Sequence, residues 1–242
     1  MVISLKIFRR LLPMSVKYQE VLERFIKHRE VRNMSQQQLA DMVGLSQSYV
    51  SKMEVGKARI PFDTLVALND NLWDIDNIIT GESYERTVLD ELFEACEDSK
   101  KADFLQYIVW TLAQGIKRYD RQLQLMGRYA EKIEYLRLKT TNTAAEESVL
   151  YGIRTAENLS QQSMAKRLHV DIKKYRALEK NIKHPDAEIL MLLYNNFECM
   201  PFEMINGKSD LREVNRIWNR LNSDLKEELL EFIKRGLAFM NK

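Results

Sequence analysis

Residues 35–59 read SQQQLADMVGLSQSYVSKMEVGKAR, and this is the most informative stretch of the chain. Apolar residues recur in it at the three- and four-residue spacings of helices. Gly44 stands in the middle, where a left-handed residue lets the chain turn sharply. The stretch therefore predicts a helix over 36–43 and a second helix over 47–54.

The composition extends this expectation to the whole chain. Its 242 residues include only 8 Gly and 4 Pro, and 45% of them are hydrophobic. Gly and Pro interrupt helices, whereas the abundant Leu, Glu, Lys, Arg and Gln favour them. We therefore expect an all-α fold with globular cores, divided into one or two domains.

The chain also matches itself when it is shifted by 125 residues. Asn33–Ala40 aligns with Asn158–Ala165, and apolar positions continue to match beyond these segments. With one inserted residue, 79–81 also aligns with 205–207. Such matching is expected when packing preserves two copies of one fold. We expect two five-helix units, each followed by a helical hairpin.

The expected organisation is sequential. Helices are expected over 16–31, 36–43, 47–54, 62–71 and 75–79 of the first unit, with hairpins over 84–97 and 100–116 and over 209–222 and 224–240. The expected domains are an N-terminal arm over 1–15, the first unit over 16–81, a hairpin with a connecting helix over 82–139, a linker over 140–145, the second unit over 146–207 and a C-terminal hairpin over 208–242. Residues 1–13 are either an ordered arm or an extension upstream of a start at Met14. An apolar stripe over 117–139 either packs on its own hairpin or forms a dimer seam.

Helix-terminal residues support these boundaries. The expected N-caps are Ser35, Ser46, Ser160, Asp171 and Ser223. Pro61 and Pro185 are expected to open helices. Gly56 and Asn181 suit left-handed positions after helices, and His169 replaces the turn glycine in the second unit, which predicts a relaxed or mildly strained turn.

Residues 20–81 resemble the Cro/C1 (Xre-type) helix-turn-helix domains of phage and bacterial repressors. The matching residues are Ser35-Gln36, Leu39-Ala40, Val43-Gly44, Ser46, Val50-Ser51, Glu54, Gly56-Lys57 and Pro61. Residues 146–207 resemble a diverged second copy. The resemblance implies two lambda-repressor-like five-helix domains. It also implies a cytoplasmic, sequence-specific regulator of transcription that binds double-stranded DNA, as a repressor.

The resemblance further implies which side chains meet DNA. The residues expected to contact bases in the major groove are Gln47, Ser48, Ser51 and Lys52. The residues expected to contact phosphates are Gln36, Tyr49, Lys57 and Arg59. A glutamine amide can bond adenine through two hydrogen bonds, and a lysine can reach the acceptors of guanine. Phosphate contacts position a protein without specifying sequence.

The second unit departs from this pattern. Ile172 stands at a base-contacting position, yet residues 166–184 hold seven basic residues where 41–59 hold three. Its candidate DNA contacts are Gln161, Lys173, Lys174 and Arg176. Two hypotheses remain open: the second unit binds phosphates and lengthens the footprint, or it serves as a dimerisation or protein-docking unit.

Other functional classes find no support in the sequence. The formal net charge is only +2. Three His and two Cys lack metal-ligand spacing, and neither a phosphate-binding loop nor a nucleophile elbow is present. Cys96 and Cys199 are expected to be buried free thiols. No apolar run approaches the ~18 residues of a membrane span.

We therefore expect neither an enzyme, a metal site nor a cofactor. Double-stranded DNA is the expected partner, and a homodimer and a regulatory protein or peptide partner are left open. The rival hypotheses are a protein-interaction module built on the helix-turn-helix scaffold and a regulator gated by a ligand.

Overall fold

The computed structural model of the chain describes residues 15–119, 148–206 and 210–241. Every regular element within these ranges is a helix, which confirms the predicted all-α fold. The predicted arm over 1–15, apart from its last residue, the greater part of the connecting helix over 117–139 and the linker over 140–145 lie outside the described residues.

Two compact units make up the chain, and each takes segments from both halves of the sequence. Unit 1 contains Met1–Ser83 and Ser148–Gly207, and unit 2 contains Tyr84–Glu147 and Lys208–Lys242. The sequence predicted domains that follow one another along the chain. It did not predict that the two five-helix segments would join in one unit and the two hairpins in the other.

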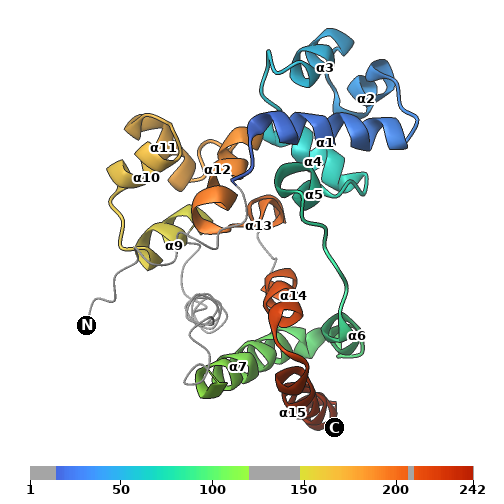
Figure 1. Cartoon of the computed structure of the whole chain (residues 1–242), viewed down its shortest axis with the longest axis vertical. Coiled ribbons are helices and arrows are strands. Elements are labelled where there is room, and N and C mark those ends of the chain that lie inside the picture. Colours follow the sequence, from blue (N-terminus) through green and yellow to red (C-terminus); the bar gives the residue numbers. More distant parts are fainter. Residues whose placement is uncertain (1–14, 120–147, 207–209, 242) are drawn as a thin grey trace. The chain divides into compact units, whose positions relative to one another are not determined.

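Unit 1 holds two sets of five helices (Figure 1). The N-terminal set consists of α1 (Tyr18–Val31), α2 (Gln36–Val43), α3 (Gln47–Glu54), α4 (Phe62–Asp70) and α5 (Ile75–Thr80). The C-terminal set consists of α9 (Val149–Ala156), α10 (Gln161–Arg167), α11 (Ile172–Glu179), α12 (Ala187–Phe197) and α13 (Pro201–Asn206). One apolar core draws on both sets, with buried side chains that include Val21, Phe25, Leu39, Val50, Met53, Ile79, Met164, Leu168, Tyr175, Leu190 and Leu193.

The predicted helix ends in unit 1 are mostly confirmed. Ser35, Ser46, Ser160 and Asp171 each accept a hydrogen bond from a backbone N–H of the following turn. Gly44 follows α2 at a φ of 68°, and His169 occupies the matching place after α10 at a φ of 53°. A histidine in this left-handed region carries a conformational cost that glycine avoids.

Two of the predicted helix starts were wrong. Asn222, not Ser223, caps the last helix and accepts from the N–H of Leu225. Asp186, not Pro185, caps α12 and accepts from the N–H of Ile189. In both places two neighbouring residues suit a helix start, and the carboxamide or carboxylate took the cap because its oxygen reaches the free N–H groups.

The two sets of unit 1 pack on each other through residues that follow their third helices in the sequence. The backbone carbonyl of Ile60 accepts a hydrogen bond from the N–H of Ala187, at 3.1 Å. Arg59 Nε lies 2.7 Å from Glu188 Oε2. Helix α5 contacts both α12 and α13. None of these named contacts involves α2, α3, α10 or α11.

Unit 2 is built from two helical pairs. It contains α6 (Val88–Glu94), the 3-10 turn η2 (Asp98–Lys100), α7 (Lys101–Tyr119), α14 (Asp210–Arg220) and α15 (Ser223–Met240). Helix α7 packs along α15 (Figure 1). Gly236 allows this close approach, because a Cβ at that position would lie 2.1 Å from the ring of Tyr107. The core includes Leu89, Phe104, Ile108, Leu112, Val214, Ile217, Leu229 and Ile233.

Two further sequence predictions have outcomes within the described residues. Cys96 and Cys199 are both free and buried, as predicted. None of the described helices combines the length and apolar character that crossing a bilayer requires.

Candidate nucleic-acid interface

Helix α3 carries the predicted base-contacting residues on its outer side. Gln47, Ser48 and Lys52 are exposed, and Ser51 is half-buried. The opposite side of α3 is fixed by apolar packing, in which the fully buried residues are Leu39, Ala40, Val50 and Met53. Small Ala40 on α2 permits the close approach of the two helices, so α3 is held rigidly while its polar side faces outward.

A chain of polar contacts runs behind this surface. Arg29 of α1 donates from Nε to Glu54 Oε1 at 2.6 Å and from Nη1 to the carbonyl of Met34 at 2.6 Å. Gln36 donates from Nε2 to Glu54 Oε2 at 2.7 Å, and Gln47 donates from Nε2 to Gln36 Oε1 at 2.7 Å. The Glu54 side chain is only 6% exposed. These polar contacts therefore connect a buried ion pair to the first residue of α3.

The donors and acceptors in this run of contacts fix the orientation of the side-chain amides of Gln36 and Gln47. Glu54 as a carboxylate only accepts hydrogen bonds, so Gln36 must turn its NH₂ group toward it. The carbonyl of Gln36 then faces Gln47, which must donate. Gln47 is left with its carbonyl oxygen and its second N–H for an outside partner. That pairing of one acceptor with one donor matches N6 and N7 of adenine.

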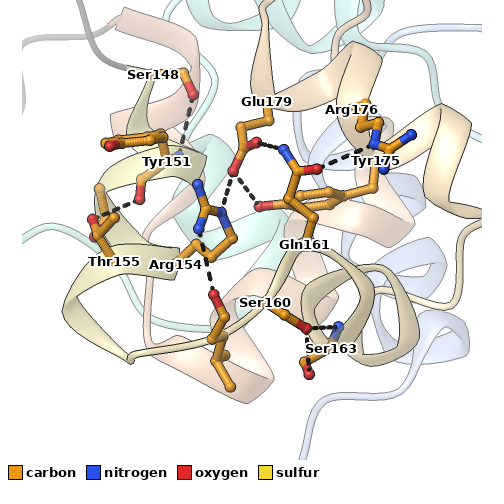
Figure 2. Close-up of polar contacts among 12 residues, drawn as sticks. Ser148, Tyr151, Arg154, Thr155, Ser160, Gln161, Ser163, Tyr175, Arg176 and Glu179 are labelled. Carbon is orange, nitrogen blue, oxygen red and sulfur yellow. Dashed lines mark hydrogen bonds and ion pairs between the residues drawn. The ribbon is translucent and has the colours of Figure 1, made fainter.

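The C-terminal set contains the same buried arrangement. Arg154 donates from Nε to Glu179 Oε1 at 2.5 Å, and Gln161 donates from Nε2 to Glu179 Oε2 (Figure 2). These three residues lie 125 positions after Arg29, Glu54 and Gln36 respectively. Tyr175 adds a hydrogen bond from its hydroxyl to Glu179 Oε1 at 2.9 Å.

Arg176 takes the place of Gln47 in this second arrangement. Its Nε donates to Gln161 Oε1 at 3.1 Å (Figure 2). Arg176 is exposed, whereas Ile172, which lies 125 positions after Gln47, is half-buried. The outward polar group of the C-terminal set is therefore a guanidinium in place of an amide.

The protonation states that this geometry needs are favoured at neutral pH. Burial by itself raises the pKa of Glu179, but hydrogen bonds from Arg154, Gln161 and Tyr175 outweigh it and hold that pKa below its usual value of 4.5. Burial, together with donation to Glu179, raises the pKa of Tyr175 far above its usual value. Glu179 is thus ionised and Tyr175 protonated, and Gln161 has to present its NH₂ group to the carboxylate.

The remaining predicted DNA contacts differ in their surroundings. Lys57 and Lys173 are exposed, and Tyr49 is half-buried. Arg59 is engaged with Glu188, and its guanidinium lies 4.5 Å from the centre of the Tyr18 ring. Lys174 Nζ lies 3.7 Å from Asp186 Oδ2. A phosphate contact from Arg59 or Lys174 stays a prediction, and it would compete with these carboxylates.

The supporting residues of the site were not predicted from the sequence. Gln36 was expected to contact a phosphate, and Arg29 was given no role. The structure places Gln36 between Glu54 and Gln47, although the phosphate contact stays a prediction. The recurrence of Arg29, Gln36 and Glu54 at a spacing of 125 residues was the signal that could have identified them.

Within the described ranges, no three His, Cys, Asp or Glu side chains are gathered in a way that would hold a metal ion.

Comparison with known proteins gives one family. A family model described as helix-turn-helix matches residues 27–72, which run from the end of α1 to just beyond α4. Neither a search of curated proteins nor a search of solved structures returned a match. Residues 27–72 thus form a helix-turn-helix domain, the kind of domain with which regulators of transcription bind DNA.

Proposed function

We propose that the chain is a sequence-specific regulator of transcription that inserts α3 into the major groove of double-stranded DNA. The observation that carries this proposal is the polar chain from Arg29 through Glu54 and Gln36 to Gln47. A solvated surface glutamine samples several rotamers, and ordering it on binding costs free energy. Gln47 is already held with its acceptor and donor outward, which reduces that cost and favours one base.

The other residues of α3 and its surroundings complete the interface. Lys52 lies one turn after Ser48 and is proposed to reach guanine acceptors. Lys57 follows α3 and is exposed, so it is proposed to contact a phosphate. We propose repression as its mode of regulation, because residues 20–81 resemble the domains of phage and bacterial repressors.

We also propose that the two helix sets of unit 1 are tandem copies. Both apolar positions and a polar arrangement recur. A buried Arg–Glu pair, hydrogen-bonded to a Gln, is found again after 125 residues. A buried ion pair is costly to place in a core unless its geometry is well satisfied. Its independent appearance at the same three positions is therefore hard to explain without common origin.

A second candidate function is protein binding by the C-terminal set. One observation favours it: Ile182, which follows α11, is 72% exposed, whereas its counterpart in the N-terminal set is Lys57. An apolar side chain at that place suits a protein surface better than a phosphate. In this alternative the N-terminal set binds DNA and the C-terminal set recruits a partner or a second copy of the chain.

The test is binding to duplexes selected from a random library by the full chain, measured by fluorescence anisotropy at several salt concentrations. Gln47→Ala should lose preference for one base, and Lys57→Ala should weaken binding to all duplexes and lower the salt slope by about 1. Gln114→Ala in unit 2, which removes another exposed glutamine, is the matched control. The proposal fails if the full chain selects no sequence, or if Gln47→Ala and Gln114→Ala behave alike.

A further inference from the structure

Several residues of the chain contact their own counterparts in the repeat. In unit 2, Asn215 Nδ2 donates to Asp90 Oδ2 at 3.0 Å, and these residues lie 125 positions apart. Also in unit 2, Tyr107 donates from its hydroxyl to the carbonyl of Phe232 at 3.0 Å, again across 125 positions. In a symmetric dimer, contacts between equivalent residues occur at the two-fold axis.

Unit 1 shows the same relation. The backbone N–H of Phe202 donates to Asp76 Oδ1 at 2.9 Å. Phe202 is the counterpart of Asp76 once the single inserted residue before 205–207 is counted. Helix α5 also contacts α13, which is its own equivalent. Each unit therefore holds the kind of contact that a two-fold axis produces.

Reciprocal contacts around the interface of unit 1 point the same way. Arg59 reaches the start of α12, where it pairs with Glu188 at 2.7 Å. His184, the counterpart of Arg59, reaches the start of α4, where its ring stacks on Phe62 with centroids 4.6 Å apart. In an interface between equivalent surfaces, each contact has a partner in which the two sides are exchanged. These two contacts exchange the sides of the interface in this manner although their side chains differ.

We infer that the chain is a covalently linked equivalent of a symmetric dimer, and that a single chain binds both halves of one operator whose halves differ in sequence. This inference rests on the proposed function. Helix-turn-helix dimers contact two half-sites about one turn of DNA apart. Here both base-contacting helices belong to one chain, so occupancy of the whole site needs no second chain.

The two halves differ because the outward groups of the two sets differ. Gln47 offers one acceptor and one donor, which suits adenine. Arg176 is tied through Nε to Gln161 Oε1, and this leaves the two Nη groups of its guanidinium as a pair of donors. A pair of donors suits O6 and N7 of guanine and is repelled by the N6 donor of adenine. Gln161 is accordingly a positioning residue for Arg176.

The neighbouring residues agree with this assignment. Lys173 is exposed beside Arg176 and can contact phosphate. Ile172, half-buried at the first position of α11, offers an apolar surface that suits a thymine methyl group. The first half-site is therefore expected to contain a required adenine, and the second a required guanine.

The experiment uses the full chain in two measurements. Duplexes are selected from a random library and sequenced for the unmodified chain, Arg176→Ala, Arg176→Lys and Gln47→Ala. The mass of the complex with the selected duplex is then measured by sedimentation. Arg235→Ala in unit 2, which removes another exposed arginine, is the matched control. Arg176→Lys keeps the charge but loses the two-pronged geometry, so it should keep the attraction to phosphate and only part of the preference for guanine.

The inference predicts a bipartite motif with unlike halves, bound by one chain. Arg176→Ala should lose the guanine, with a drop in affinity of roughly 5- to 150-fold for the best duplex, and keep the adenine. Arg176→Lys should lose less affinity and prefer guanine less strongly than the unmodified chain, because lysine keeps the charge but not the two-pronged geometry. Gln47→Ala should lose the adenine and keep the guanine.

Three other results overturn it. A single short motif that Arg176→Ala leaves unchanged would leave the N-terminal set as the sole DNA contact and the proposed function intact. Two identical halves bound by two chains would mean ordinary dimerisation. Absence of any selected sequence would remove the proposed function together with the inference.

Discussion

Two buried carboxylates, Glu54 and Glu179, stand behind the helices proposed to meet DNA. Each accepts from an arginine on the first helix of its set and from a glutamine on the second. Because each carboxylate is buried, removing its arginine leaves a charge without compensation. At the residue scale the proposed interface thus depends on two carboxylates that are buried behind it.

Replacing Arg29 with methionine should destabilise unit 1 by about 3–5 kcal/mol, since Glu54 then stays buried without its partner. Changing Glu54 to leucine in the same protein should recover most of this loss. DNA affinity should stay low in the double variant, because Gln36 no longer has a carboxylate to hold it. Urea unfolding and anisotropy measure the two effects. Equal stability of the single and double variants would contradict the account.

The fall in the free energy of unfolding at low pH should depend on Glu179. Its folded pKa lies below its usual value of 4.5, so its contribution is complete above the unfolded pKa and is lost as the pH falls through the folded pKa. The stability difference between the unmodified chain and Glu179→Gln should therefore shrink as the pH falls from about 6 to about 3. Urea unfolding at a series of pH values measures it, and a difference independent of pH would refute the assignment.

At the scale of elements, most of the fold followed from local chemistry. The caps at Ser35 and Ser46 and the turn at Gly44 depend on residues within one helical turn, so the sequence predicted α2 and α3 to the residue. The start of α15 was misplaced by one position, because Asn222 and Ser223 both suit a cap. Where two adjacent residues are almost equivalent, the sequence alone does not decide between them.

The left-handed residue in the turn after α2 and after α10 can be tested in each set. His169→Gly should stabilise unit 1 by about 0.5–1 kcal/mol, because the histidine is held at a left-handed φ of 53°. Gly44→Ala should destabilise it by about 1 kcal/mol. A Cβ at Gly44 would meet nothing within 4 Å, so this cost is conformational and not steric. Thermal unfolding measures both, and a melting temperature lowered by His169→Gly would contradict the turn geometry.

At the scale of the molecule, the decisive contacts join different helices, and some of these helices lie more than a hundred residues apart in the sequence. The exposed side chains of α3 were predictable, because their spacing places them on one face. The link from Arg29 to Gln47 was not, since it depends on how α1 crosses α3. The association of the two hairpins was not predictable either, because helical periodicity identifies an apolar face without naming its partner.

Gly236 tests the packing of the two hairpins. A Cβ there would lie 2.1 Å from the Tyr107 ring, whose hydroxyl is tied to Phe232, so Gly236→Ala should destabilise unit 2 by about 1–3 kcal/mol. Hydrogen exchange of peptides from α7 and α15 should quicken. Tyr107→Ala combined with Gly236→Ala should show a smaller loss than the sum of the two, since the clash is then removed. Strict additivity would argue against this packing.

The sharpest test alters both sides of the proposed contact between Gln47 and adenine. The adenine of the selected duplex is changed to 7-deazaadenine, which lacks the N7 acceptor, and binding is measured for the unmodified chain and for Gln47→Ala. The account predicts a loss of about tenfold for the unmodified chain and little further loss for the variant, because Gln47 supplies the donor. Equal losses in both proteins would show that Gln47 does not contact that base, and would contradict the central claim.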